Sequence, residues 1–306
     1  MKHPPFIRIA TRKSPLARIQ AEAVRQKLFA AFPKMAIEIV PMNTSGDANT
    51  TAVLADIGGK GLFTKELEES LLGNKIDIAV HSLKDMETHL PSNLIMAATL
   101  EREDPGDALV APGAKTISNL PKGASVGTSS VRRTALLRIL RPDLNIVPFR
   151  GNVTTRLAKL DKGEVDATIL AIAGLKRLNM EGRATEIFNT EHFIPAVGQG
   201  IIAIECREDN NVVRDMLQAI NHSPTYIAAT TERSMLAVLD GSCRTPIGGY
   251  ARFEGEALRI DAIIASKDGS SHVRASRTGN AKDALGIGQD IARELLENGG
   301  RECLKQ

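Results

Sequence analysis

The sequence has few aromatic residues and almost no excess of charge. Aromatic side chains make up 3% of its 306 residues, tryptophan is absent, and the formal net charge is +3. Proteins that bind single-stranded nucleic acid usually combine aromatic side chains, on which bases stack, with a strongly basic surface. We therefore expect no nucleic-acid partner.

Cysteine is also scarce, and no apolar run is long. The three cysteines, Cys206, Cys243 and Cys303, are too widely spaced for a disulfide framework or a zinc site, so we expect no metal. No run approaches the roughly 20 apolar residues that cross a membrane. The first five residues, Met-Lys-His-Pro-Pro, lack the apolar core of a signal peptide. We expect a soluble, cytoplasmic protein without a membrane partner.

The first 195 residues use one strand–turn–helix pattern twice. A strand over residues 6–10 leads through a turn with Arg and Ser into a helix from Pro15 to about residue 32. A second strand ending at Gly127 leads through a similar turn into a helix that stops before Pro142. Further strands follow in the same order in both copies, over residues 37–40 and 76–80, then 145–149 and 165–169. Alternating apolar strands and helices predict two α/β domains with mainly parallel sheets.

The remainder of the chain changes character. A strand over residues 201–205 is interpreted as returning to the first sheet, which makes the first domain discontinuous. A helix near 225–239, strands near 250–254 and 257–264, and a final helix near 281–296 predict a small α+β domain. The predicted domains are residues 1–100 with 201–219, residues 105–195, and residues 222–306.

The turn that opens the second copy is suited to an anion. Thr128, Ser129 and Ser130 precede a helix whose first turn carries Arg132 and Arg133. A helix N-terminus offers unpaired N–H groups and a positive dipole end, to which hydroxyl and guanidinium donors add. The alternative is an ordinary N-cap followed by two solvated arginines.

Further cations follow other predicted strand ends, namely Arg12 beside Ser14 in the first copy and Arg150, Arg156 and Arg177 in the second. Ligands of open α/β sheets bind beyond the carboxyl ends of the strands, so these side chains can meet at one site. Several cations suit a ligand with several carboxylates, although phosphate is not excluded. Arg156 also fits a solvated helix face, and Arg177 a helix cap.

Three other features indicate catalytic or ligand-binding roles. Lys84 and Asp85 follow a buried strand, where an ionised Asp85 stabilises positive charge, with a surface ion pair as the alternative. Cys243 lies in a Gly/Pro-rich loop beside Arg244, whose charge lowers a thiol pKa, although a lone cysteine is often inert. The long connection over residues 41–62, with Lys60 among three glycines, predicts a lid or, alternatively, a passive surface loop.

Several runs, taken together and in order, resemble the hydroxymethylbilane synthase (porphobilinogen deaminase) family. They are ATRKSPLA at 10–17, GGKGLF at 58–63, HSLKD at 81–85, GTSSVRR at 127–133, RGNV at 150–153, PAVGQG at 195–200 and CRTPIG at 243–248. The resemblance spans nearly the whole chain. It implies two periplasmic-binding-protein-like domains and a C-terminal α+β domain that carries the cysteine.

The resemblance also implies a reaction. Four porphobilinogen molecules are joined head to tail into hydroxymethylbilane, each losing ammonia, on a dipyrromethane cofactor bound to Cys243 by a thioether. It implies that Asp85 is catalytic, since loss of ammonia leaves an electron-poor pyrrole that a carboxylate stabilises. The implied binding residues are Lys84, Thr128, Ser129, Arg132 and Arg133 for the cofactor, and Arg12, Ser14, Gln20, Arg150, Arg156 and Arg177 for the substrate or growing chain.

The sequence departs from the family in the predicted lid. Asp56 stands where some members have lysine, so the lid role is assigned to Lys60. We expect a monomer that passes its product to a downstream tetrapyrrole enzyme. The alternative function is a non-enzymatic two-domain anion-binding receptor, which the duplicated α/β halves would also suit. Such a receptor needs neither the Lys84–Asp85 pair nor the Cys243 loop.

Overall fold

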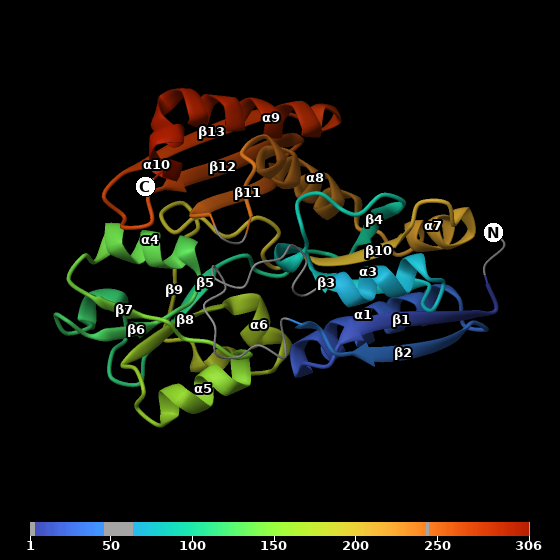
Figure 1. Cartoon of the computed structure of the whole chain (residues 1–306), viewed down its shortest axis with the longest axis horizontal. Helices are drawn as coiled ribbons and strands as arrows, with labels where there is room; N and C mark the ends of the chain where they lie inside the picture. The colour runs from blue at the N-terminus through green and yellow to red at the C-terminus, as the bar shows by residue number, and fades with distance from the viewer. Residues whose placement is uncertain (1–3, 46–63, 243–244, 306) are drawn as a thin grey trace. The chain divides into compact units, whose positions relative to one another are not determined.

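The computed structural model describes residues 4–45, 64–242 and 245–305 (Figure 1). These residues form two compact units. The first contains residues 4–45, 64–103 and 201–226, and the second contains residues 104–200, 227–242 and 245–305. The chain therefore leaves the first unit and returns to it, as a discontinuous first domain requires.

The first unit is built on one five-stranded sheet, ordered β2-β1-β3-β10-β4. Its strands are β1 (Phe6–Arg12), β2 (Ala36–Met42), β3 (Ile78–Ser82), β4 (Leu94–Thr99) and β10 (Ile202–Arg207). Its helices are α1 (Pro15–Ala31), α3 (Lys65–Leu72) and α7 (Asn211–Gln218), with a 3₁₀ turn, η1 (Leu83–Asp85). The predicted return of the strand near residue 201 is confirmed, because β10 pairs with β3 and β4.

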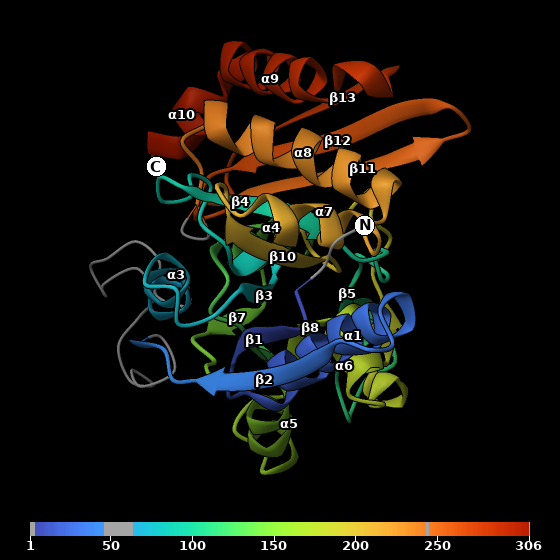
Figure 2. The ribbon, with the colours of Figure 1, turned by 90° about the vertical axis from the view of Figure 1, so that its right-hand side faces the viewer.

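Local sequence explains why α1 begins directly after β1. The Ser14 hydroxyl accepts a hydrogen bond from the Ala17 amide, and Pro15 takes a first-turn position where its missing N–H costs nothing. Buried side chains then recur at helical spacing along α1. This stripe faces β1, β2 and β3, against which the helix lies (Figure 2).

The two faces of this sheet are covered by different helices. Ile9, Ile78 and Ile204 pack in one cluster with residues of α1 and α7. Ala10 and Ala79, on the opposite face, pack against Leu67 and Leu71 of α3. Strand side chains alternate between the faces, so each position of β1, β3 and β10 belongs to one of these two layers.

The second unit holds a sheet of similar design, ordered β7-β6-β8-β5-β9. Its strands are β5 (Asp107–Val110), β6 (Ser125–Gly127), β7 (Asn145–Val147), β8 (Ala167–Ala171) and β9 (Glu186–Ile187). Its helical segments are η2 (Ile117–Asn119), α4 (Val131–Leu140), α5 (Val153–Asp161), α6 (Ile172–Arg177) and η3 (Glu181–Arg183).

The repeat seen in the sequence is a repeat of topology. In each sheet the first three strands are parallel neighbours, and the last two are joined through antiparallel pairings. The expectation of mainly parallel sheets thus holds for the strands that carry the repeated motif. The antiparallel partners, β10 and β5, are contributed by the segments that cross between the units, which periodicity within one copy does not reveal.

The second unit also contains a three-stranded antiparallel sheet, ordered β11-β12-β13. The strands are β11 (Ile247–Glu254), β12 (Ala257–Ala265) and β13 (His272–Asn280). The helical segments of this region are η4 (Ala281–Asp283), α9 (Ala284–Leu295), η5 (Leu296–Gly300), α10 (Arg301–Lys305) and α8 (Ser223–Val238), whose first turn belongs to the first unit. This is the predicted α+β region with one additional strand, β13, which is largely polar and has little apolar alternation. The limits of the three domains stay a prediction.

Candidate active site

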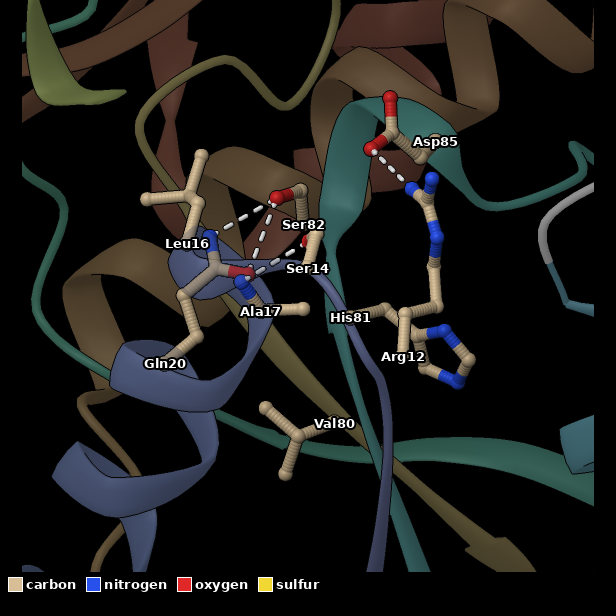
Figure 3. A pocket seen from close by; sticks show the side chains of 9 residues that line it. All are labelled: Arg12, Ser14, Leu16, Ala17, Gln20, Val80, His81, Ser82 and Asp85. Carbon is tan, nitrogen blue, oxygen red and sulfur yellow. Dashed lines mark hydrogen bonds and ion pairs between the residues drawn. The ribbon is translucent and has the colours of Figure 1, made fainter. Parts of the chain in front are cut away.

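A small pocket in the first unit gathers four of the predicted site residues. Its volume is about 50 Å³, and it is lined by Arg12, Ser14, Leu16, Ala17, Gln20, Val80, His81, Ser82 and Asp85 (Figure 3). Because β1 and β3 are parallel neighbours, their carboxyl ends meet at the same sheet edge. Arg12 ends β1 and Asp85 follows β3, so the topology brings together residues 73 positions apart.

The wall of the pocket on the α1 side is fixed by polar contacts. Gln20 is buried, and its amide nitrogen lies 2.8 Å from the Ser82 hydroxyl. The Thr11 hydroxyl donates to the Ala17 carbonyl at 3.0 Å, which ties the end of β1 to the first turn of the helix. The start of α1 is therefore held against the ends of both strands.

Asp85 forms an ion pair with Arg12 in this pocket. Its Oδ2 atom lies 3.8 Å from Arg12 Nη1, with side-chain exposures of 36% and 22%. At that distance the pair is electrostatic and not a hydrogen bond, so the carboxylate keeps acceptor positions for a ligand. The sequence suggested Lys84 as the ionic neighbour of Asp85. Lys84 lies half-buried on the same turn.

A buried pair beside the pocket was missed in the sequence analysis. His81 Nε2 lies 3.0 Å from Glu205 Oε2, and both side chains are almost completely buried. Glu205 Oε1 has no hydrogen-bond partner within the described residues. A charged residue inside the predicted apolar strand 201–205 was the available signal, since a buried carboxylate usually requires a partner.

In the second unit, the predicted residues follow the ends of β6, β7 and β8, which are parallel. Thr128 and Ser129 accept hydrogen bonds through their hydroxyls from the amides of Ser130 and Phe149, at 3.2 and 3.0 Å. Each hydroxyl thus retains its hydrogen for donation. Gly127 lies directly against Phe149, where an added Cβ would come within 2.6 Å of the ring.

Arg132 and Arg133 are not solvated, contrary to the alternative of an ordinary N-cap with exposed arginines. They are only 4% and 6% exposed. Both bind the carboxylate of Asp107, with Nη2–oxygen distances of 2.7 and 2.6 Å. Arg132 also donates to the Ile194 carbonyl at 2.9 Å. The Ser130 hydroxyl caps the helix by accepting a hydrogen bond from the Arg133 amide, so the N-cap part of that alternative is present while its exposed arginines are not.

Asp107 is the central residue of this cluster, and no motif in the sequence marks it as a site residue. Its side chain is fully buried at the start of β5 and also accepts from Gln199 Nε2 at 3.0 Å. Burial by itself would raise the Asp107 pKa, but the charges of Arg132 and Arg133 outweigh it and hold the pKa well below its usual range. Two guanidiniums against one carboxylate leave one net positive charge.

The remaining arginines are placed differently. Arg150 follows β7 and is half-buried, and its Nη1 has no hydrogen-bond partner among the described residues. The next residue, Gly151, has φ +119°, a conformation that favours glycine. Arg156 lies half-buried within α5, and Arg177 ends α6, donating to the Gly200 carbonyl at 2.7 Å.

Cys243 and Lys60 lie outside the described residues. The other two cysteines are buried, and burial raises the pKa of Cys206 to about 12, so its thiol is not a nucleophile at neutral pH. In the described part of the chain, no cluster of three or more His, Cys, Asp or Glu side chains is arranged to hold a metal ion. None of the helices described is both long and apolar enough to span a membrane.

The chain is similar to several solved structures. One is the methionine-binding protein MetQ, with 16% sequence identity, coverage of 75% of this chain and 95% of that chain, and a TM-score of 0.46. Another is the periplasmic VFT2 domain of BvgS from Bordetella pertussis, with 16% identity, coverage of 75% of this chain and 92% of that chain, and a TM-score of 0.43. A nutrient-binding protein from Burkholderia cenocepacia bound to methionine is also similar, with 14% identity, coverage of 70% of this chain and 91% of that chain, and a TM-score of 0.42.

Family models identify the chain more directly. Residues 7–215 match the dipyrromethane cofactor binding domain of porphobilinogen deaminase, and residues 226–297 match the C-terminal domain of the same enzyme. The matches cover most of the chain and do not favour a non-enzymatic receptor. The chain belongs to the porphobilinogen deaminase family, transferases that join four porphobilinogen molecules into hydroxymethylbilane, release ammonia and carry a dipyrromethane cofactor.

Proposed function

We propose that Asp85 is the principal catalytic group of this enzyme. The observation that carries the proposal is its pocket, where the carboxylate lies 3.8 Å from Arg12 and shares the lining with Ser14 and Gln20. When ammonia leaves porphobilinogen, positive charge develops on the pyrrole, and a fixed carboxylate stabilises that charge. Arg12, Ser14 and Gln20 supply donors for the acetate and propionate groups of the substrate.

The cofactor is assigned to Lys84 and to the cluster around α4, namely Thr128, Ser129, Arg132 and Arg133. Dipyrromethane bears carboxylates, and this cluster fits them because it has a net positive charge and hydroxyl hydrogens to donate. Arg132 Nε is buried and has no hydrogen-bond partner within the described residues, so a donor remains to be used. When bound, the cofactor supplies the pyrrole chain end to which substrate is added, with Cys243 as its covalent attachment.

Chain growth is assigned to Arg150, Arg156 and Arg177, with Lys60 in a lid. Each added unit brings two further carboxylates, so growth needs cations beyond those that hold the cofactor. The unused Nη1 of Arg150 supports this role. We also propose the three-domain division given above, a monomeric state, a cytoplasmic location and delivery of the product to a downstream tetrapyrrole enzyme.

Replacement of Asp85 by asparagine tests the catalytic assignment. Asp85→Asn preserves size and removes charge, so turnover should fall by about 100-fold or more, as expected when a group that stabilises the transition state is lost. Steady-state kinetics and thermal unfolding of the purified variant are the measurements. Asp77→Asn, which breaks an ion pair with Arg8 away from the pocket, is the control. Near wild-type turnover of Asp85→Asn would overturn the assignment.

Mass spectrometry tests the attachment. The intact mass of the native protein should exceed that of the bare chain by two linked pyrrole units, and peptide mapping should place them on Cys243. Cys243→Ser should lack the increment and be inactive, because serine is a far weaker nucleophile than a thiolate at neutral pH. Cys206→Ser, which changes a thiol of raised pKa, should retain the increment. Active native protein with the bare mass would contradict the attachment.

A further inference from the structure

A row of three ionisable side chains crosses the sheet of the first unit: Arg12 on β1, His81 on β3 and Glu205 on β10. β1 and β3 are parallel with Ala10 opposite Ala79. Two residues further along each strand, this register places Arg12 beside His81, on the same face of the sheet. Both side chains line the pocket that contains Asp85.

The register of β10 places Glu205 on that face as well. In the antiparallel pairing of β3 and β10, Ala203 lies opposite His81 and Glu205 opposite Ala79. Glu205 is therefore the diagonal neighbour of His81, a position from which long side chains can reach one another. The 3.0 Å contact between His81 Nε2 and Glu205 Oε2 is the result, with the two side chains 3% and 0% exposed.

The helix α3 covers this row and contributes one more acid, Glu68. Burial, with a smaller contribution from the negative charge of Glu205, raises the Glu68 pKa. Glu87 adds further negative charge near Glu68. Glu205 is the acceptor that fixes the imidazole, through its ring nitrogen Nε2.

We propose that Glu205 and His81 are positioning residues that hold Arg12 beside Asp85. Figure 3 shows the His81 ring next to the aliphatic part of Arg12, whose guanidinium extends to Asp85. With Nε2 bound to a buried carboxylate, the ring cannot rotate away, and Arg12 has a rigid neighbour. Neither Glu205 nor His81 is assigned contact with the reacting atoms. The inference rests on the proposed role of Asp85.

A double-mutant cycle tests the inference. Glu205→Gln should lower kcat/KM by about 10- to 100-fold, the range expected for small displacements of a binding or catalytic group. Arg12→Gln should lower it as well. If Glu205 acts by positioning Arg12, Glu205→Gln should cause no further loss in the Arg12→Gln background. The inference would be overturned if the fold-losses in kcat/KM of the two single variants multiplied in the double variant. It would also be overturned if Glu205→Gln had the kcat/KM of the wild type.

A second variant keeps the test decisive if Glu205→Gln folds poorly. His81→Gln removes the ring but retains an amide that can donate to Glu205, and it should show the same absence of further loss with Arg12→Gln. Asp77→Asn, which changes the residue directly before β3 and outside the pocket, should leave kcat/KM unchanged. The two proposals fail separately. An active Asp85→Asn contradicts the catalytic assignment, whereas an inactive Asp85→Asn with multiplicative cycles contradicts only the positioning role.

Discussion

The two units place arginine at equivalent strand–turn–helix motifs but use it differently. In the first unit, Arg12 ends the strand two residues before the N-cap Ser14 and forms an open ion pair with Asp85. In the second, Arg132 and Arg133 come two and three residues after the N-cap Ser130 and are buried on Asp107. In these two motifs the arginine that precedes the cap lines the pocket, and the two that follow the cap are buried within the unit.

This difference also separates two kinds of electrostatic interaction. A half-exposed ion pair contributes little to stability, so Arg12 and Asp85 can be arranged for a ligand. The buried cluster of the second unit depends on its one carboxylate, because removing Asp107 leaves two buried guanidiniums without a compensating charge. The residues of the second unit that we assign to ligand binding are therefore also residues on which stability depends, whereas Arg12 and Asp85 of the first unit should contribute little to stability.

The largest expected effect is on the stability of the Asp107 cluster. Asp107→Ala leaves Arg132 and Arg133 buried without their carboxylate and should lower the free energy of unfolding by about 3–5 kcal/mol. Asp77→Ala, which breaks the partly exposed pair with Arg8, should cost about 1 kcal/mol or less. Denaturant unfolding measures both values. Equal losses in the free energy of unfolding for Asp107→Ala and Asp77→Ala would contradict the distinction between buried and partly exposed ion pairs.

The second prediction concerns cofactor content. Arg132→Leu should yield mostly protein without dipyrromethane, because Arg132 belongs to the cluster assigned to the cofactor. Arg177→Leu should retain the cofactor and slow or stall during chain growth. Intact-mass analysis and turnover measure the two effects, and thermal unfolding must first show that Arg132→Leu is folded. A folded Arg132→Leu with normal cofactor content would show that the division between the two arginines is wrong.

The smallest expected effect is on the acid side of the stability curve. The Asp107 pKa is lowered in the folded protein, so its contribution is present above the ordinary carboxyl value of about 4 and is lost as the pH falls below it. Between neutral pH and pH 3, wild-type protein should therefore lose more stability than Asp107→Asn, which has no carboxyl to protonate there. Unfolding curves across this pH range provide the comparison. If wild type and Asp107→Asn lost equal stability over this pH range, the lowered pKa of Asp107 in the folded protein would be contradicted.

Much of the architecture follows from local pattern. Pro15 at a helix start and Pro142 beyond a helix end helped to predict α1 and α4, and short apolar runs predicted the strands that lead into them. The pairing partners of β10 and the extra strand β13 needed more information. Strand pairing joins segments far apart in the chain, and β13 has too little apolar alternation to stand out.

The sequence by itself determined the family and the residue types of the site, since cations and hydroxyls after strand ends are a local feature of the chain. Only the tertiary structure decided which of them meet. It placed Arg12 against Asp85, buried Arg132 and Arg133 on Asp107, and joined His81 to Glu205, which lies 124 residues away. Charges interact through space and burial, and neither is set by position along the chain.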